Sequence, residues 1–156
     1  MDISICKSIH TWTQLSIHTI KHTYALPGDY RIRLYNICNF DNIRVINKLI
    51  SFTTIGNVLT NLSNMFESSV FNQPLRWNTL RVTNMVSMFD NSIFNQQLIW
   101  DTSSVTNMSW MFHGSEFNQP LHWNTSSVND MSWIFKGAKS FNQPIHWDTS
   151  SVTYMT

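Results

Sequence analysis

The sequence predicts a repeat solenoid, in which one unit of 23 or 24 residues recurs from about Val58 to the last residue. Two observations predict it. A Phe-Asn-Gln triplet opens four units, at Phe71, Phe94, Phe117 and Phe141. A Trp follows each opening Phe after six residues, and a Val and a Met follow that Trp at constant spacing. Self-similarity at a period of 20 to 50 residues is typical of stacked repeats.

The first half of each unit is predicted to be a short strand. Leu75 and Trp77 alternate with Arg76 and Asn78, and the other units show the same period of two. Alternation of this kind indicates a strand with one buried face. Each Trp lies two residues after the aliphatic residue and so faces the same side of the strand. We therefore expect the Trp column to lie in the core, and not to form an exposed platform on which sugars or bases stack.

The second half of each unit is predicted to contain one or two helical turns. Val82, Met85, Met88 and Phe89 are separated by three and four residues, which is the helical spacing. Asn91 follows two residues later, where a left-handed residue often ends a helix. One unit cannot bury its apolar face alone, so the units are expected to stack and to pair their strands into a parallel sheet.

Residues 1–57 precede the array and are predicted to form a β-rich N-terminal cap. Tyr30, Ile32 and Leu34 alternate as a strand does, after a turn at Pro27-Gly28. The segment 22–34 resembles the last strands of a PKD-type β-sandwich. The domain boundaries that follow are 1–57 for the cap and 58–156 for the array, and the chain ends at Thr156 inside a fifth unit, so the array is expected to be truncated.

The repeat pattern, Phe-Asn-Gln-Pro-Leu followed by Trp-Asp-Thr-Ser-Ser-Val-Thr-Asn-Met, resembles that of BspA-type leucine-rich-repeat surface proteins. The resemblance covers about 100 residues. It implies a leucine-rich-repeat-like fold, a role in adhesion or protein binding, and a location on a cell or virion surface. One residue separates the Leu from the Trp here, where the family has a longer link.

A non-enzymatic binding module is therefore the expected function, with a protein partner bound on the strand face. The outward strand positions are the candidate binding residues, since in a solenoid they line one continuous surface. They are Arg76, Asn78, Ile99, Asp101, His122, Asn124, His146 and Asp148. A vestigial repeat fragment without activity of its own, and a β-solenoid enzyme, are the alternatives.

Composition and charge argue against several other classes of function. The formal net charge is +1 and the charged fraction is 12%, with no Lys/Arg block, so no nucleic-acid partner is expected. No segment has the roughly 20 apolar residues of a membrane span or the pattern of a signal peptide. We expect no cofactor, no metal site and no catalytic constellation. An uncapped C-terminal end is expected to favour self-association.

Overall fold

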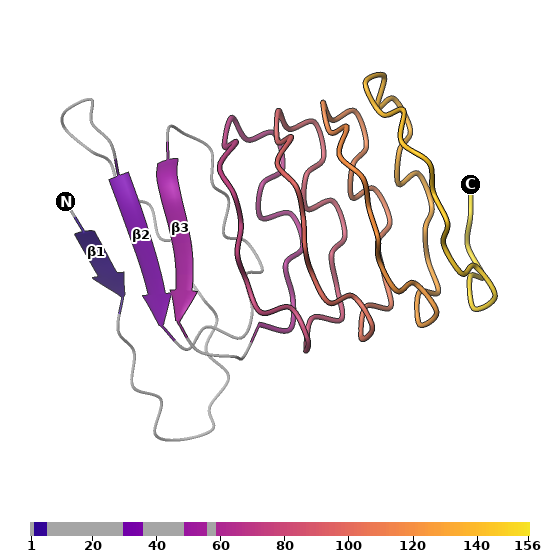
Figure 1. Cartoon of the computed structure of the whole chain (residues 1–156), viewed down its shortest axis with the longest axis horizontal. Coiled ribbons are helices and arrows are strands. Elements are labelled where there is room, and N and C mark those ends of the chain that lie inside the picture. Colours follow the sequence, from indigo (N-terminus) through magenta and orange to yellow (C-terminus); the bar gives the residue numbers. More distant parts are fainter. Residues whose placement is uncertain (1, 6–29, 36–48, 56–58) are drawn as a thin grey trace.

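The computed structural model describes residues 2–5, 30–35, 49–55 and 59–156 of the chain. The first three ranges are the strands β1 (Asp2–Ile5), β2 (Tyr30–Tyr35) and β3 (Leu49–Ile55). They form a three-stranded sheet in the order β1-β2-β3, and both pairs of strands are parallel. The sheet lies at one end of the molecule, beside the repeat array (Figure 1).

The predicted N-terminal cap, residues 1–57, thus contains three strands. Within the PKD-like segment 22–34, residues from Tyr30 onward belong to β2, and residues 22–29 lie outside the described residues. Parallel strands need a crossover connection and are not joined by a tight hairpin turn.

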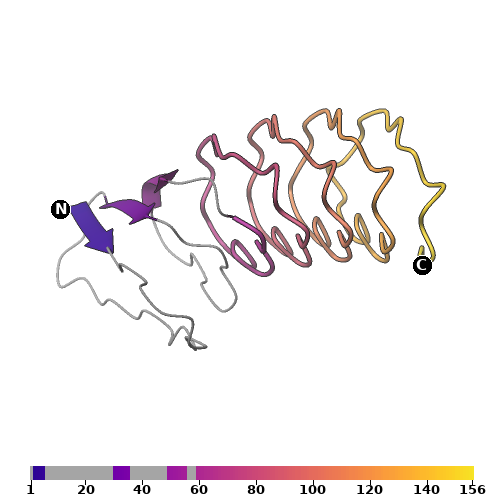
Figure 2. The same ribbon diagram turned by 90° about the horizontal axis from the view of Figure 1, so that it is seen from below.

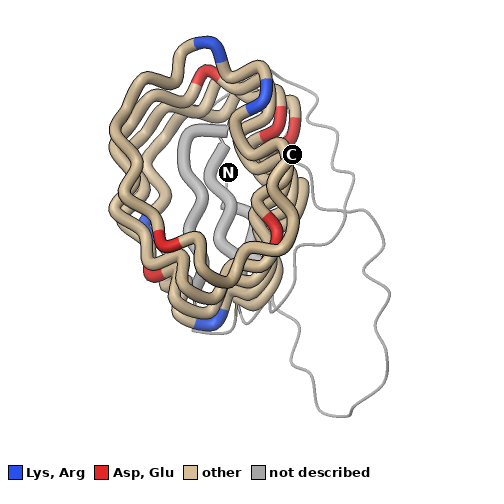
Figure 3. The backbone as a smooth tube through the Cα atoms, turned by 90° about the vertical axis from the view of Figure 1, so that its right-hand side faces the viewer, with Lys and Arg blue, Asp and Glu red and all other residues tan. Residues whose placement is uncertain are grey.

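Residues 59–156 form coils that lie side by side along one axis (Figures 1 and 2). Seen along that axis, the coils nearly superimpose (Figure 3). Equivalent residues of successive coils are joined in parallel by isolated bridges. The bridged residues are Asn61, Asn84, Asn107, Asp130 and Tyr154.

The helical turns predicted between Val82 and Phe89 are wrong, because no residue from 59 to 156 lies in a helix. Ser87 and Asn91 both adopt the left-handed conformation, with φ of 52°. A left-handed residue interrupts an α-helix, and tight turns form instead. In one of them the N–H of Met88 donates to the carbonyl of Met85 at 3.3 Å. Apolar spacings of three and four residues fit these turns as well as they fit a helix.

Every second N–H group of this segment is donated to the next coil, which is the physical reason that a helical ladder does not form. The donors in one coil are Met85, Ser87, Phe89 and Asn91. The acceptors, each 22 residues further along the chain, are the carbonyls of Asn107, Ser109, Met111 and His113, at 2.8–3.0 Å. We call residues 84–91 and their equivalents the turn segments.

The strand predicted at Leu75 to Trp77 and its equivalents is not formed either. Within residues 59–156, no backbone hydrogen bond joins Leu75–Trp77 to the following coil. The indole rings of successive coils lie 5.9–6.4 Å apart, which is wider than the roughly 4.8 Å at which strands pair. Side chains make the connection instead: the Trp100 indole N–H donates to the carbonyl of Leu75 at 3.1 Å. The predicted alternation of buried and exposed residues is confirmed for the units that open at Phe71, Phe94 and Phe117, but in the last unit Ile145 is exposed.

A column of asparagines links the coils next to these segments. The N–H of Asn95 donates to Oδ1 of Asn72 at 2.9 Å, the N–H of Asn118 to Oδ1 of Asn95 at 2.8 Å, and the N–H of Asn142 to Oδ1 of Asn118 at 2.9 Å. Each amide oxygen thus replaces the backbone carbonyl that a paired strand would supply.

The core consists of aromatic columns that run through the stack. Phe66, Phe89, Phe112 and Phe135 form one column, with ring centroids 5.5–5.6 Å apart and nearly parallel planes. The opening Phe residues form a second column and the Trp residues a third, and Trp77, Trp100 and Trp123 are at most 7% exposed. The prediction that the Trp column belongs to the core is confirmed.

Candidate functional site

One row of the predicted binding residues is exposed along the whole array. Arg76, Ile99, His122 and His146 occupy equivalent positions in four successive coils, and all four are exposed. Ile99 is 83% exposed, the largest value among the exposed large hydrophobic side chains. In the first three of these coils the flanking residues are buried aliphatic and Trp side chains, and in the last coil Ile145 is exposed and Trp147 half-buried. We call these four residues the exposed row.

The second row serves the backbone of its own coil. Asn78, Asp101, Asn124 and Asp148 are exposed, but in each the Oδ1 atom accepts the N–H of the residue two positions further on, at 2.9–3.1 Å. Such a bond from side chain to backbone stabilises a turn. We call these four residues the Asx row, and their role in the turns accounts for the restriction to Asn and Asp.

Two carboxyl groups of the Asx row, those of Asp101 and Asp148, have a pKa below the ordinary value. The pKa of Asp101 is lowered mainly because the Ser103 hydroxyl donates to its carboxylate at 2.6 Å, and next because the Ser103 N–H does so at 2.9 Å. The pKa of Asp148 is lowered in the same way by Ser150. Both bonds stabilise the charged carboxylate.

In each coil the residue of the exposed row and that of the Asx row stand immediately before and after one Trp, and both are exposed. Within the described residues, no group of three or more His, Cys, Asp or Glu side chains is placed to hold a metal ion. In the described part of the chain, no helix is long and apolar enough to cross a membrane.

The sequence places Trp110 and Trp133 beside the apolar Met111 and Ile134, which indicates partly exposed aromatics suited to ligand contact, but it does not predict the cluster that they form on the turn segments. Trp110 and Trp133 stack on each other at 4.9 Å with an interplanar angle of 3°, outside the core columns. Nζ of Lys136 lies 3.1 Å from the centroid of the Trp133 ring. In the neighbouring coils, Nδ1 of His113 lies 2.8 Å from Oδ1 of Asp90. The 23-residue spacing of the two Trp residues was the signal for their stacking, and Gly137 was the signal for a left-handed residue after Lys136, but neither predicted that Lys136 would lie over the Trp133 ring.

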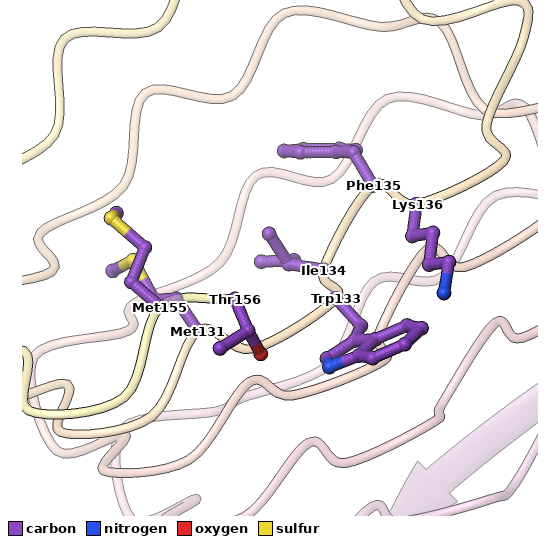
Figure 4. A pocket seen from close by; sticks show the side chains of 7 residues that line it. All are labelled: Met131, Trp133, Ile134, Phe135, Lys136, Met155 and Thr156. Carbon is purple, nitrogen blue, oxygen red and sulfur yellow. The ribbon is translucent and has the colours of Figure 1, made fainter.

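A hollow of about 410 Å³ lies beside this cluster, at the last coil. Figure 4 shows Lys136 directed toward the Trp133 ring and Met155 on the opposite side of the hollow. The last coil also exposes apolar side chains: Ile145 is 40%, Met155 63% and Tyr154 65% exposed.

The family model of DUF285, described as a Mycoplasma protein of unknown function, matches residues 36–122 and again residues 90–156. This match corrects the family predicted from the repeat pattern: the matching model is that of DUF285, a family associated with BspA-like repeat proteins, and not that of the BspA-type surface proteins themselves. Adhesion and a surface location therefore do not follow from family membership. No curated protein and no solved structure matches the chain.

Proposed function

The chain belongs to the DUF285 family, whose description assigns no function, and from the site itself we propose that its array is a leucine-rich-repeat-like solenoid acting as a non-enzymatic protein-binding module. The exposed row is the proposed contact surface. Adhesion at a cell or virion surface is one setting in which such a module would act.

The observation that carries the proposal is the contrast between the exposed row and the repeated positions that stacking and turn formation fix around it. The core columns, the Asn column and the Asx row each keep one or two residue types, because stacking or turn formation requires them. The exposed row contains Arg, Ile, His and His. Stacking places no chemical demand on these side chains, so they are available to recognise a partner.

The dimensions favour an extended segment of a protein as the ligand. The flanking Trp rings of successive coils lie 5.9–6.4 Å apart, so three steps give a row roughly 18 Å long, which matches about five residues of an extended chain at about 3.4 Å each. Arg76 offers charge-assisted hydrogen bonds to a carboxylate. Ile99 offers an apolar contact beside it. A segment with an acidic residue followed by an apolar residue would complement this end of the row.

A library of displayed peptides, selected on the purified chain, tests the proposal. The selected peptides are then titrated against the chain and against a variant with Arg76→Ala, His122→Ala and His146→Ala together. We expect the triple variant to lose at least about tenfold in affinity, which corresponds to about 1.4 kcal/mol. Arg81→Ala is the matched control, because Arg81 is an exposed arginine outside the row.

Two outcomes would contradict the proposal. Selection that yields no peptide with reproducible affinity would favour a purely structural role. Peptides that bind the triple variant as tightly as the unmodified chain would place the binding site elsewhere. Circular dichroism spectra of the variants establish that the fold is retained in each case.

A further inference from the structure

The turn segments expose a second surface, which we call the turn face. It is built from two columns of residues, all at least partly exposed. The first column holds the first of the two left-handed residues of each segment: Asn64, Ser87, Trp110 and Trp133. The second column lies three residues further along in each coil: Glu67, Asp90, His113 and Lys136.

The two tryptophans stand where the backbone does not favour them. Trp110 and Trp133 have φ of 61° and 62°, and a bulky side chain is disfavoured in the left-handed region, whereas Asn is among the residues that tolerate it best. The same position holds Asn64 in the first coil and Ser87 in the second. Since the fold is built without an indole in those coils, the indoles contribute something other than the turn. Strained residues of this kind cluster at functional sites.

The turn face changes in size and in charge along the array. Its first two coils carry small side chains in the first column and acids in the second, and its last two coils carry indoles and basic residues. Lys136 completes the basic end, with its ammonium 3.1 Å from the Trp133 ring centroid. The Asp90–His113 contact of 2.8 Å marks the change of sign at the middle.

We propose that the turn face binds the turn face of a second copy of this chain, in an antiparallel, two-fold arrangement. The two-fold axis lies in the interface, perpendicular to the stacking direction, and passes between the second and third coils. Large residues then face small ones, and bases face acids, at all four levels. The facing pairs are Trp133 with Asn64, Trp110 with Ser87 and Lys136 with Glu67, each occurring twice, and at the middle levels the Asp90–His113 contact of one copy faces that of the other.

The pattern specifies a second copy of this chain as the partner, because one turn face carries both the large and basic residues and the small and acidic residues that complement them. In a two-fold interface each residue that contacts another is contacted by it in turn. The face is only two residues wide in each coil, so we expect a weak dimer that forms at high protein concentration. This inference uses a different surface from the exposed row and does not rest on the proposed function.

Sedimentation velocity from about 1 μM to about 1 mM measures the dimer directly. The decisive variants exchange the charges of one facing pair. Lys136→Glu and Glu67→Lys should each raise the dissociation constant at least about tenfold, because each places like charges opposite each other twice per dimer. The double variant Lys136→Glu/Glu67→Lys should restore it to within about threefold. Lys139→Glu is the matched control and should leave the constant unchanged, because it makes the same change of charge outside the two columns.

Rescue by the double variant cannot come from within one chain. Three coil spacings of about 4.8 Å separate Lys136 from Glu67 of the same copy, roughly 14 Å. The Debye length is about 8 Å at 0.15 M salt, so an exposed pair at that distance is largely screened. Restored association therefore requires that the two residues meet between copies.

Trp133→Asn keeps the test decisive if a charge variant fails to fold. Asn64 occupies the same position in the first coil, so the substitution suits the backbone. It should leave the monomer at least as stable to urea while weakening the dimer at least about tenfold. A chain that stays monomeric at all concentrations, or single charge variants that associate like the unmodified chain, would overturn the proposal. Association that is lost instead in Tyr154→Ser/Met155→Ser would assign it to the last coil and also overturn it.

Discussion

Replacement of Asn95 by Ala should destabilise the chain, because its amide oxygen is an acceptor that holds two coils together. Oδ1 of Asn95 accepts the N–H of Asn118 at 2.8 Å and Nε2 of Gln119 at 3.2 Å. No strand pairing is present at this side of the coils to replace these bonds. The Asn118 N–H would be left without its acceptor in a half-buried position.

The expected loss of stability in Asn95→Ala follows from the loss of two neutral hydrogen bonds, one of which comes from a backbone N–H that is partly shielded from water. A half-buried donor that loses its acceptor costs about 1–3 kcal/mol, so Asn95→Ala should lower the free energy of unfolding by about 2 kcal/mol. Asn95→Asp keeps the accepting oxygen and should change it by less than about 0.5 kcal/mol at neutral pH.

Asn142→Ala is the matched control in the last coil. Asn142 holds the same position in its unit, but within residues 59–156 no donor reaches its amide oxygen, while its own N–H still bonds to Asn118. We expect a change of less than about 0.5 kcal/mol. Urea denaturation followed by far-ultraviolet circular dichroism measures all three variants, and hydrogen exchange of the Asn118 amide reports the bond itself. Equal losses for the Ala variants at positions 95 and 142 would refute the reasoning.

Two further predictions concern the turns. Gly114→Ala should lower the free energy of unfolding more than Gly137→Ala does. Both residues have positive φ, which costs about 1–2 kcal/mol for Ala, but only at Gly114 would the added Cβ overlap Oδ1 of Asn91. Urea denaturation of the two variants should show a further loss of about 1 kcal/mol at Gly114, and equal losses would contradict this reasoning. Ser103→Ala should raise the pKa of Asp101 toward its ordinary value of 3.8, because it removes the hydrogen bond from the Ser103 hydroxyl. The charged carboxylate stabilises the fold above pH 3.8, and this stabilisation is lost as the pH falls through the lowered pKa, so in the variant it should disappear at a higher pH. An NMR titration of the Asp101 carboxyl group measures the pKa, and an unchanged midpoint would contradict the assigned cause.

Much of the core was predictable because each buried position repeats one residue type. Phe94, Trp100 and Met108 recur at fixed spacing in the other units, and all three are buried. The exposed row was equally predictable, since alternation about the buried Leu and Trp fixes which residues face outward. The function of the Asx row was not, because the sequence shows Asn and Asp at an outward position without showing that their oxygens bond to the backbone two residues on.

By itself, the sequence determined the period, the core residues and the direction in which each outward residue points, since these depend only on which side chains recur. The tertiary structure decided the hydrogen bonding, because donors in the turn segments and in the Asn column find their acceptors in the neighbouring coil. It also decided which way the segment from Val82 to Phe89 would fold, because a spacing of three and four residues suits both a helix and a series of tight turns. Because alternate N–H groups of this segment donate to carbonyls of the next coil, the segment forms tight turns and not a helix. These turns also place Trp110 and Trp133 on the surface as a stacked pair.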